Sequence, residues 1–534
     1  MSVPVSPYTI LALAPFGPVP ETGYKPRLTE ADIYTLDQAL AEMGPRFWVE
    51  LPRDVCPQGG LDLAVTSLSG FKPENLVKNT PYLAELEACR VFLAQSRSAN
   101  AAPRGVADDI KRQWPGLELD LSLPQADSGN APANGDAIDD ILSMVATEAS
   151  SAGGSSAGAG GTGGGLADWQ AQVETLLARA LAAVFADPQF RAYEAAWRGA
   201  ECLARKAGVK EGGRVRLLLC PVSPETLADA LGALAVQLIQ DTPHLALVDQ
   251  GFDNSPASIE LLGQVLAFAD TLLVPVAASV TLDFFRVGSW RELSKLGYLK
   301  AAFADAQYAK FRKLAEHPGA SRLLLTLNAF LSRAPYGPGN AARPVAFTEA
   351  APLWLSPAWA VGTLAAKSVV QYGWPSRLAD YRTIFLEELA VFDSGEGPAA
   401  TQGLFDENRI AELLEAGFSP VVAARGRDTA MLPRQTALDG GSFVFQLFFG
   451  RVVSHLLQAR ENAPESAQSD PAGAVRQALM NLFNQTDQTP PPDMTVDAGQ
   501  EPGQEEGGRI PVTIAFTPPR AVMGGERLTF GFGW

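Results

Sequence analysis

Few residues in this 534-residue chain have the types and spacing of a chemical site. Residues 154–158 (GSSAG) match the GxSxG pattern of a nucleophilic serine, here Ser156, and residues 158–163 (GAGGTG) match the GxGxxG pattern of a phosphate-binding loop. Both patterns work only at a strand-to-helix turn, but residues 149–165 contain nothing except Ala, Ser, Gly and Thr. Such a tract produces both patterns by chance, so an α/β hydrolase using Ser156 is the weakest of our functional hypotheses.

The remaining reactive residue types are scattered along the chain. The adjacent acids Asp108/Asp109, Asp139/Asp140 and Glu387/Glu388 do not share a helix face, which favours solvated carboxylates over acid and base pairs. The three histidines and four cysteines do not have the spacing of metal ligands; they are His244, His317, His455, Cys56, Cys89, Cys202 and Cys220. The sequence also contains no Walker A pattern. We therefore predict no catalytic, cofactor-binding or metal-binding residue, no cofactor, and a protein that is not an enzyme.

The composition restricts the class of partner and the compartment. The formal net charge is −17, with 59 acidic and 42 basic residues, whereas nucleic-acid binders need a basic face, so no nucleic-acid partner is expected. Charged residues make up 19% of the chain, below the roughly 25% typical of soluble domains, which suggests that some surface is hidden in an assembly. The lack of paired cysteines fits a cytoplasmic protein.

The start of the chain lacks a signal-peptide pattern, and the apolar tracts are shorter than the roughly 20 residues that span a bilayer, so no membrane insertion is expected.

Hydrophobic periodicity predicts a mixed α/β fold. A helix from Pro81 has one apolar face made by Tyr82, Leu86, Cys89 and Leu93. Further helices are predicted at 169–184, 224–239 and 258–269, and strands at 8–14, 47–51, 61–67, 215–220, 245–248, 272–276, 322–327, 510–516 and 528–534. Strands that alternate with helices of this length form parallel crossovers. We expect mixed sheets flanked by helices, plus extended strands at both ends of the chain.

The low-complexity tract divides the chain. Residues 101–147 are polar, with one short apolar patch at 138–145 that predicts a small helix in an extended connector. The expected organisation is therefore one domain at 1–100, a connector and linker at 101–165, and a second region at 166–534. Residues 462–470 and 488–508 are predicted exposed loops. The alternating Ile510, Val512, Ile514 and Phe516 form a candidate inter-subunit strand, because an extended apolar strand can pair with a neighbouring molecule.

Two parts of the chain carry a family resemblance. Residues 8–14 and 68–90 resemble the small subunit of the type VI secretion contractile sheath, TssB. The matching pattern is a strand, then Leu-x-x-Phe-x-Pro, then a helix that ends near an arginine. Matching positions are Leu68, Phe71, Pro73, Leu76, Pro81, Leu83, Leu86 and Arg90.

The region after the linker is similar to the large sheath subunit, TssC. Residues 187–199 (DPQFRAYEAAWRG) match its early helix at Pro188, Phe190, Glu194, Trp197, Arg198 and Gly199. Three further motifs follow in the family's order: 331–337 (LSRAPYG) with Arg333, Pro335, Tyr336 and Gly337; 372–377 (YGWPSR) with Tyr372, Gly373 and Trp374; and 411–421 with Gly417, Phe418 and Pro420. The whole chain resembles a fusion of both sheath subunits.

The chemistry of these motifs is structural. We expect Pro335 to fix a turn and Gly337 to adopt a left-handed conformation after an apolar strand. Trp197 and Trp374 are expected to anchor a core, while Arg198, Arg333 and Arg377 hold carbonyls or carboxylates through forked hydrogen bonds.

The resemblance implies a structural subunit that polymerises with copies of itself into a helical tube around an inner tube and contracts. Its implied partners are the inner-tube protein, baseplate components and an AAA+ disassembly ATPase. Little remains of the small subunit's C-terminal helical region, and residues 379–410 are shorter than the family norm, which places contraction and recycling in question. The alternative is a sheath-derived accessory or cap protein that does not polymerise.

Overall fold

The centre of the molecule is a seven-stranded sheet. The computed structural model describes residues 6–20, 23–122, 164–463, 470–498 and 510–534. The sheet has the order β13-β8-β7-β6-β1-β5-β2, and every neighbouring pair is parallel except β2 with β5. The strands are β13 (Phe418–Pro420), β8 (Leu323–Leu327), β7 (Val276–Val280), β6 (Leu245–Phe252), β1 (Tyr8–Ala14), β5 (Val215–Pro221) and β2 (Thr29–Ala31).

Strand β1 lies in the interior of this sheet, between β5 and β6. Its sequence YTILALA is a continuous apolar run, and all seven residues are buried, as expected for a strand covered on both faces. Ile10 and Ala12 belong to one hydrophobic cluster, whereas Leu11 and Leu13 belong to another. The N-terminal part of the chain therefore shares a sheet, and both of its cores, with the part that follows residue 166.

Helices cover both faces of the sheet. Helices α7 (Pro188–Ala207) and α13 (Pro357–Tyr372) pack together in the first cluster, and α8 (Leu227–Gln237) and α9 (Pro256–Leu272) in the second. The predicted parallel α/β core is confirmed. The predicted strand at 272–276 is wrong by about one helical turn: Leu272 completes α9, Leu273 takes a left-handed φ of 55°, and β7 begins only at Val276.

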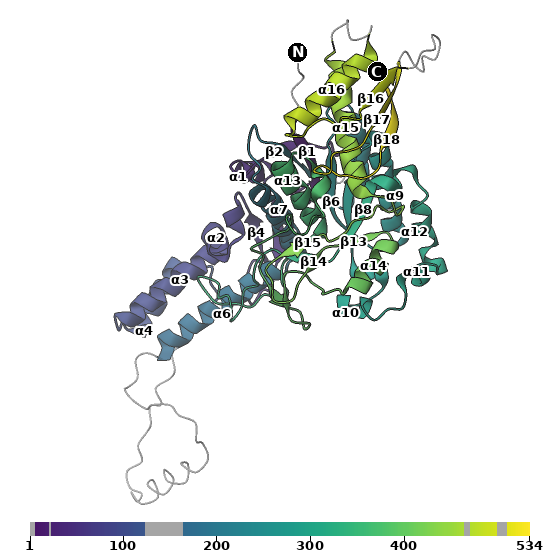
Figure 1. The fold of residues 1–534 in the computed structure, drawn as a ribbon. Helices are drawn as coiled ribbons and strands as arrows, with labels where there is room; N and C mark the ends of the chain where they lie inside the picture. Colours follow the sequence, from purple (N-terminus) through teal and green to yellow (C-terminus); the bar gives the residue numbers. More distant parts are fainter. Residues whose placement is uncertain (1–5, 21–22, 123–163, 464–469, 499–509) are drawn as a thin grey trace, which may run out of the picture.

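A helical arm extends from one end of the sheet (Figure 1). Helix α3 (Pro81–Ser98) lies along α6 (Gly164–Ala186), and its buried residues include Tyr82, Leu86, Cys89 and Leu93, which confirms the predicted apolar face. The connector begins with α4 (Pro103–Gln113), while the predicted small helix at 138–145 and most of the linker lie outside the described residues. Near the base of the arm are α1 (Leu36–Met43), η1 (Leu68–Phe71), α2 (Pro73–Asn79) and the hairpin of β3 (Arg46–Glu50) and β4 (Gly60–Ala64).

The C-terminal residues form a third cluster at the opposite end of the molecule from the arm (Figure 1). Helices α15 (Phe443–Glu461) and α16 (Pro471–Gln485) pack against an antiparallel sheet of β16 (Thr495–Ala498), β17 (Pro511–Phe516) and β18 (Leu528–Gly533). The candidate inter-subunit strand is β17, the central strand of this sheet. Both of its edges are occupied within the same chain, so the edges left for a neighbour are those of β16 and β18.

Short elements connect these parts. They are α10 (Trp290–Leu293), α11 (Leu299–Ala302), α12 (Ala309–Leu314), α14 (Glu407–Glu415), η2 (Leu282–Phe285), η3 (Ala306–Tyr308), η4 (Pro318–Arg322), η5 (Pro375–Arg377), and the strand pairs β9 (Phe330–Leu331) with β10 (Trp354–Leu355), β11 (Phe392–Asp393) with β12 (Pro398–Ala399), and β14 (Val422–Ala423) with β15 (Ala430–Met431). Among the described helices, none has the length and apolarity to cross a bilayer.

Candidate functional site

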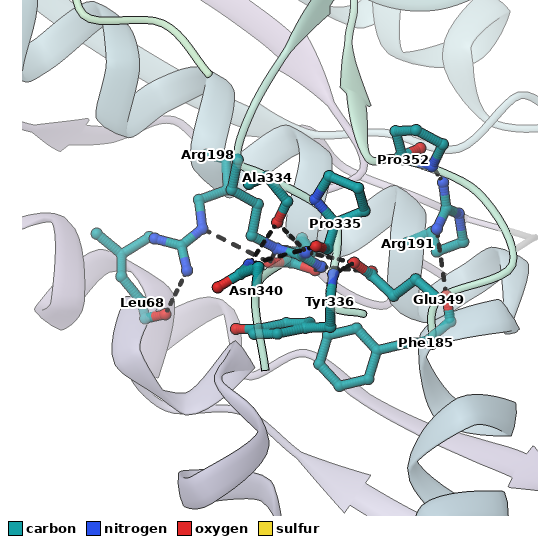
Figure 2. A network of polar contacts seen from close by, with 12 residues as sticks. Leu68, Phe185, Arg191, Arg198, Ala334, Pro335, Tyr336, Asn340, Glu349 and Pro352 are labelled. Carbon is teal, nitrogen blue, oxygen red and sulfur yellow. Dashed lines mark hydrogen bonds and ion pairs between the residues drawn. The ribbon is translucent and has the colours of Figure 1, made fainter. Parts of the chain in front are cut away.

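Arg333 is the centre of an ionic network with two buried carboxylates, one of which, Glu349, is labelled in Figure 2. Its guanidinium donates to both carboxylate oxygens of Glu194, at 2.9 and 3.1 Å, and to both oxygens of Glu349, at 2.7 and 2.8 Å. The side chains of Glu194 and Glu349 are 1% and 0% exposed. Burial alone would lower the pKa of Arg333, but the hydrogen bonds to Glu349 and Glu194 outweigh it and hold that pKa above its ordinary value.

Aromatic side chains enclose this pair of ion pairs. The Arg333 guanidinium carbon lies 4.6 Å from the centre of the Tyr336 ring and 5.4 Å from that of Phe185. Tyr336 also donates its backbone N–H to Glu349, at 2.6 Å. Residues 331–337 thus fold around Arg333, and Glu349 connects the loop that follows this motif to the Arg333 side chain and to the backbone of Tyr336.

Arg198 connects the network to the N-terminal part of the chain. Its Nε lies 3.7 Å from Glu194, its Nη1 donates to Glu201 at 2.8 Å, and its Nη2 donates to the carbonyl of Leu68 at 3.5 Å (Figure 2). Leu68 begins η1, so the network joins the N-terminal part of the chain to α7 and to the motif of Arg333.

A cavity of about 640 Å³ adjoins this network, lined in part by Lys72, Arg198, Cys202 and Arg333. Burial raises the pKa of the Cys202 thiol to about 11, so the thiol stays protonated at neutral pH and is a poor nucleophile. No histidine lines this cavity. The arrangement has the properties of an interior scaffold, because Arg333 and Arg198 are both ion-paired with carboxylates of the same chain.

Gly199 permits close packing of α7 against α13. A Cβ atom at Gly199 would lie 2.4 Å from the Trp359 ring. The nearest ring atoms are Cε2 and Nε1 of Trp359, and this Nε1 donates to Asp249 at 2.8 Å. Trp197 is fully buried and donates its indole N–H to the carbonyl of Phe16, at 2.8 Å, which confirms that it anchors the core.

The motif 372–377 joins the main core to the C-terminal cluster. Gly373 ends α13 with a left-handed φ of 76°, and a Cβ there would approach the Thr486 carbonyl to 2.5 Å. Trp374 lies against Phe448 and Phe483 and donates to Thr486 Oγ1 at 2.9 Å. Arg377 holds Asp380 at 2.5 Å and covers the Tyr372 ring at 4.4 Å.

Other predicted positions lie apart from the Arg333 network. Gly417 has a φ of 89° and leads into Phe418, which stacks on Phe311 at 5.6 Å, and Pro420 ends the edge strand β13. Phe71 is closer: its ring lies 5.7 Å from that of Phe190, and Phe190 in turn contacts Phe185 beside Arg333. Pro73 occupies the first turn of α2.

The expectation for Gly337 is wrong. It does not have a positive φ; it forms an antiparallel bridge with Asn340, whose side chain donates to the carbonyls of Ala334 and Pro335. The asparagine closes this turn, so no left-handed residue is needed. Sequence reasoning also missed Glu349, which stands in no recognised motif.

No described cluster of three or more His, Cys, Asp or Glu side chains is arranged to hold a metal ion.

Comparison with known proteins identifies relatives of the second part of the chain. Residues 241–438 match the family model described as EvpB/VC_A0108, tail sheath N-terminal domain (VipB). The type VI secretion system sheath protein TssC1 of Pseudomonas aeruginosa is 27% identical over 272 residues, which are 45% of this chain and 55% of that protein. The chain thus spans about half the length of this curated relative.

The solved structures found by comparison have low identity to this chain and low TM-scores. The helical sheath of the anti-feeding prophage in its contracted state is 14% identical, with a TM-score of 0.32 over 62% of this chain and 77% of that one. A sheath tail protein from Listeria innocua is 10% identical, with a TM-score of 0.32 over 59% and 60% of the two chains. Residues 241–438, which match the tail sheath family model, include β6 to β8, the Arg333 motif and the Trp374 motif.

Proposed function

We propose that this chain is a structural subunit of a type VI contractile sheath and that it combines the small and the large subunit in one polypeptide. Copies polymerise into a helical tube around an inner tube, and contraction of the tube drives the inner tube outward. The motif resemblance and the sequence relationship of residues 241–438 support the large-subunit assignment.

The observation that carries the fusion proposal is the position of β1. This strand comes from the part that resembles the small subunit, yet it pairs with β5 over seven residues and with β6 over four. The arm adds a second contact, because α3 lies along α6. A fused chain fixes the ratio of the two parts at one to one and gives β1 a high effective concentration for its place in the sheet.

The role we assign requires no bond-making chemistry. Energy for contraction is stored in interfaces between subunits that have two packings, so no cofactor is consumed at the moment of firing. The Arg333 network keeps the subunit rigid while those interfaces change. We place the protein in the cytoplasm, with copies of itself, the inner-tube protein and baseplate components as partners, and an AAA+ ATPase as a further candidate.

Electron microscopy of the purified full chain tests the assembly proposal. We expect tubes or stacked rings, with inner-tube protein promoting their formation. Dispersed particles at high concentration, with and without that protein, would instead support the accessory or cap protein.

A split-chain experiment tests the fusion proposal separately. Residues 1–122 and 164–534 are produced alone and together. We expect the larger piece to be soluble only when the smaller one is present, because β5 and β6 otherwise lose the strand between them. A stable, soluble 164–534 fragment that does not bind residues 1–122 would contradict the proposal.

A further inference from the structure

Arg451 is a buried cation without a counter-ion. It lies on α15 and is 5% exposed, and its Nε and Nη1 atoms have no hydrogen-bond partner. Among the ion pairs of the described residues, none includes Arg451. Arg333 differs in both respects: it is only partly buried, and its guanidinium binds two carboxylates.

The neighbours of Arg451 do not neutralise its charge. The guanidinium carbon lies 5.5 Å from the ring centres of Tyr8 and Trp374, whose faces attract a cation but leave its N–H groups unbonded. His455, one turn along α15, directs Nε2 to the Ala478 carbonyl at 3.1 Å, while its Nδ1 has no partner. His244 accepts from the backbone N–H of Thr9 and stacks on Tyr8. Burial lowers the pKa of Arg451 to about 10, but the side chain stays charged at neutral pH.

An unpaired buried guanidinium is unfavourable, since it has lost the hydrogen bonds that water gives it and has received none in return. Buried charged groups are therefore nearly always paired or in contact with a bound ion. Among the described residues, Arg451 is the exception that has neither an ion-pair partner nor a bonded Nε or Nη1.

A cavity of about 350 Å³ opens at this side chain. Its wall includes Arg451, Lys210, Arg214, Arg216, Glu30 and Thr486, from segments that meet beside β5 and the end of α13. Two of the other cations already have partners: Arg214 pairs with Asp487, and Arg216 pairs with Glu30 and Asp241 at 2.8 Å each. Four cations and one carboxylate thus line the cavity, and Arg451 is the buried cation, with no ion pair among the described residues.

We propose that this cavity, here called the Arg451 cavity, binds an oxyanion. The guanidinium supplies the charge and the hydrogen bonds, and the ligand supplies oxygen acceptors, as in carboxylate and phosphate recognition by arginine. Two sources offer this chemistry: a free phosphate ion, and the carboxylate of an acidic side chain on a second copy of this chain.

The test compares thermal unfolding of the full chain in sodium phosphate and in sodium chloride at equal ionic strength and neutral pH. We expect phosphate to raise the melting temperature saturably, because a ligand that binds only the folded state stabilises it. In Arg451→Met the phosphate effect should disappear, while the melting temperature in chloride should equal or exceed that of the unmodified chain, since an unpaired charge has been removed. Calorimetric titration with phosphate should show about a 10- to 100-fold loss of affinity, the value of one charge-assisted hydrogen bond.

Two further variants make the result decisive. Arg322→Met removes another partly buried arginine, which pairs with Asp270, and should keep the full phosphate effect. If Arg451→Met does not fold, Arg451→Lys keeps the charge and should show a reduced phosphate effect. The proposal is overturned if phosphate neither raises the melting temperature of the unmodified chain above its value in chloride nor changes its sedimentation, or if the Arg451 variant responds to phosphate as the unmodified chain does.

Sedimentation distinguishes the two sources of the anion. If a carboxylate of a second copy fills the Arg451 cavity, phosphate competes with it and shifts the chain toward smaller species. If the ligand is free phosphate, phosphate binds without changing the sedimentation of the chain. Both results support an oxyanion site, and they differ only in the ligand.

Discussion

Arg333 and Glu194 are 139 residues apart in the sequence and are joined by two hydrogen bonds of 2.9 and 3.1 Å in the interior. The same guanidinium bonds Glu349 twice, so one cation balances two buried carboxylates. Such a network adds little net stability to the folded state. Removing one of its members is nevertheless strongly destabilising, because the remaining charges are then buried without a counter-ion.

Substitution Arg333→Met should therefore destabilise the fold by about 3 to 5 kcal/mol, since Glu194 and Glu349 would face each other without a cation. Denaturant unfolding measures the change. Arg112→Met is the control: its ion pair with Asp109 is exposed, so the expected change is below about 1 kcal/mol. Equal changes in the two variants would refute the assigned role of the network.

Gly199→Ala should separate α7 from α13. The added methyl group would meet the Trp359 ring at 2.4 Å, and overpacking of this kind costs about 1 to 3 kcal/mol. The matched change Gly232→Ala lies in α8, where nothing is within 4 Å, and should instead add about 0.5 to 1 kcal/mol. Thermal unfolding of both variants gives the comparison, and a stabilised Gly199→Ala chain would contradict the packing argument.

Asp249 should give the stability a measurable pH dependence. Burial raises its pKa from 3.8 to about 6, so the folded state holds this proton more tightly than the unfolded chain does. The stabilisation that comes from binding this proton in the folded state is complete below about pH 4 and is lost as the pH rises through 6. Asp249→Asn keeps an acceptor for Trp359 Nε1 but does not titrate.

The difference in unfolding free energy between Asp249→Asn and the unmodified chain should therefore grow in favour of the variant between pH 4 and 7. At about 1.4 kcal/mol per pKa unit, the growth is at most about 3 kcal/mol. The difference isolates this carboxyl from all others that titrate in the same range, and a constant difference would show that Asp249 ionises normally.

Thr529→Pro tests whether the free edge of β18 takes part in assembly. Ile510 and Trp534 exchange both backbone hydrogen bonds, so by alternation the N–H of Thr529 points away from β17. Proline there removes one outward donor and leaves the pairing with β17 intact. We expect tubes to be lost with little change in melting temperature, whereas Thr529→Ala should assemble normally; tubes formed by the proline variant would exclude this edge.

The sequence predicted those parts that depend on local patterns. The apolar run of β1 and the single apolar face of α3 are visible in the residues themselves, because burial follows their periodicity. The start of β7 was misplaced because Leu272 and Val276 belong to one apolar tract, and only the left-handed Leu273 divides it into a helix and a strand.

The candidate site was predicted in part. Arg333, Glu194 and Arg198 all belong to motifs, but no periodicity showed that these distant positions meet, and Glu349 stands in a loop outside the motifs. Arg451 was not identified at all, since it stands in the apolar segment of α15, where its neighbours indicate only a core helix.

The interior position of β1 has a consequence for the order of folding. This strand is made early, but its two neighbours begin about 200 residues later, at Val215 and Leu245. During synthesis, the apolar strand β1 therefore has both hydrogen-bonding edges unpaired until β5 and β6 have been made. Long-range pairing of this kind slows folding and prolongs exposure to aggregation, so chaperone protection of the nascent chain is most valuable in that interval.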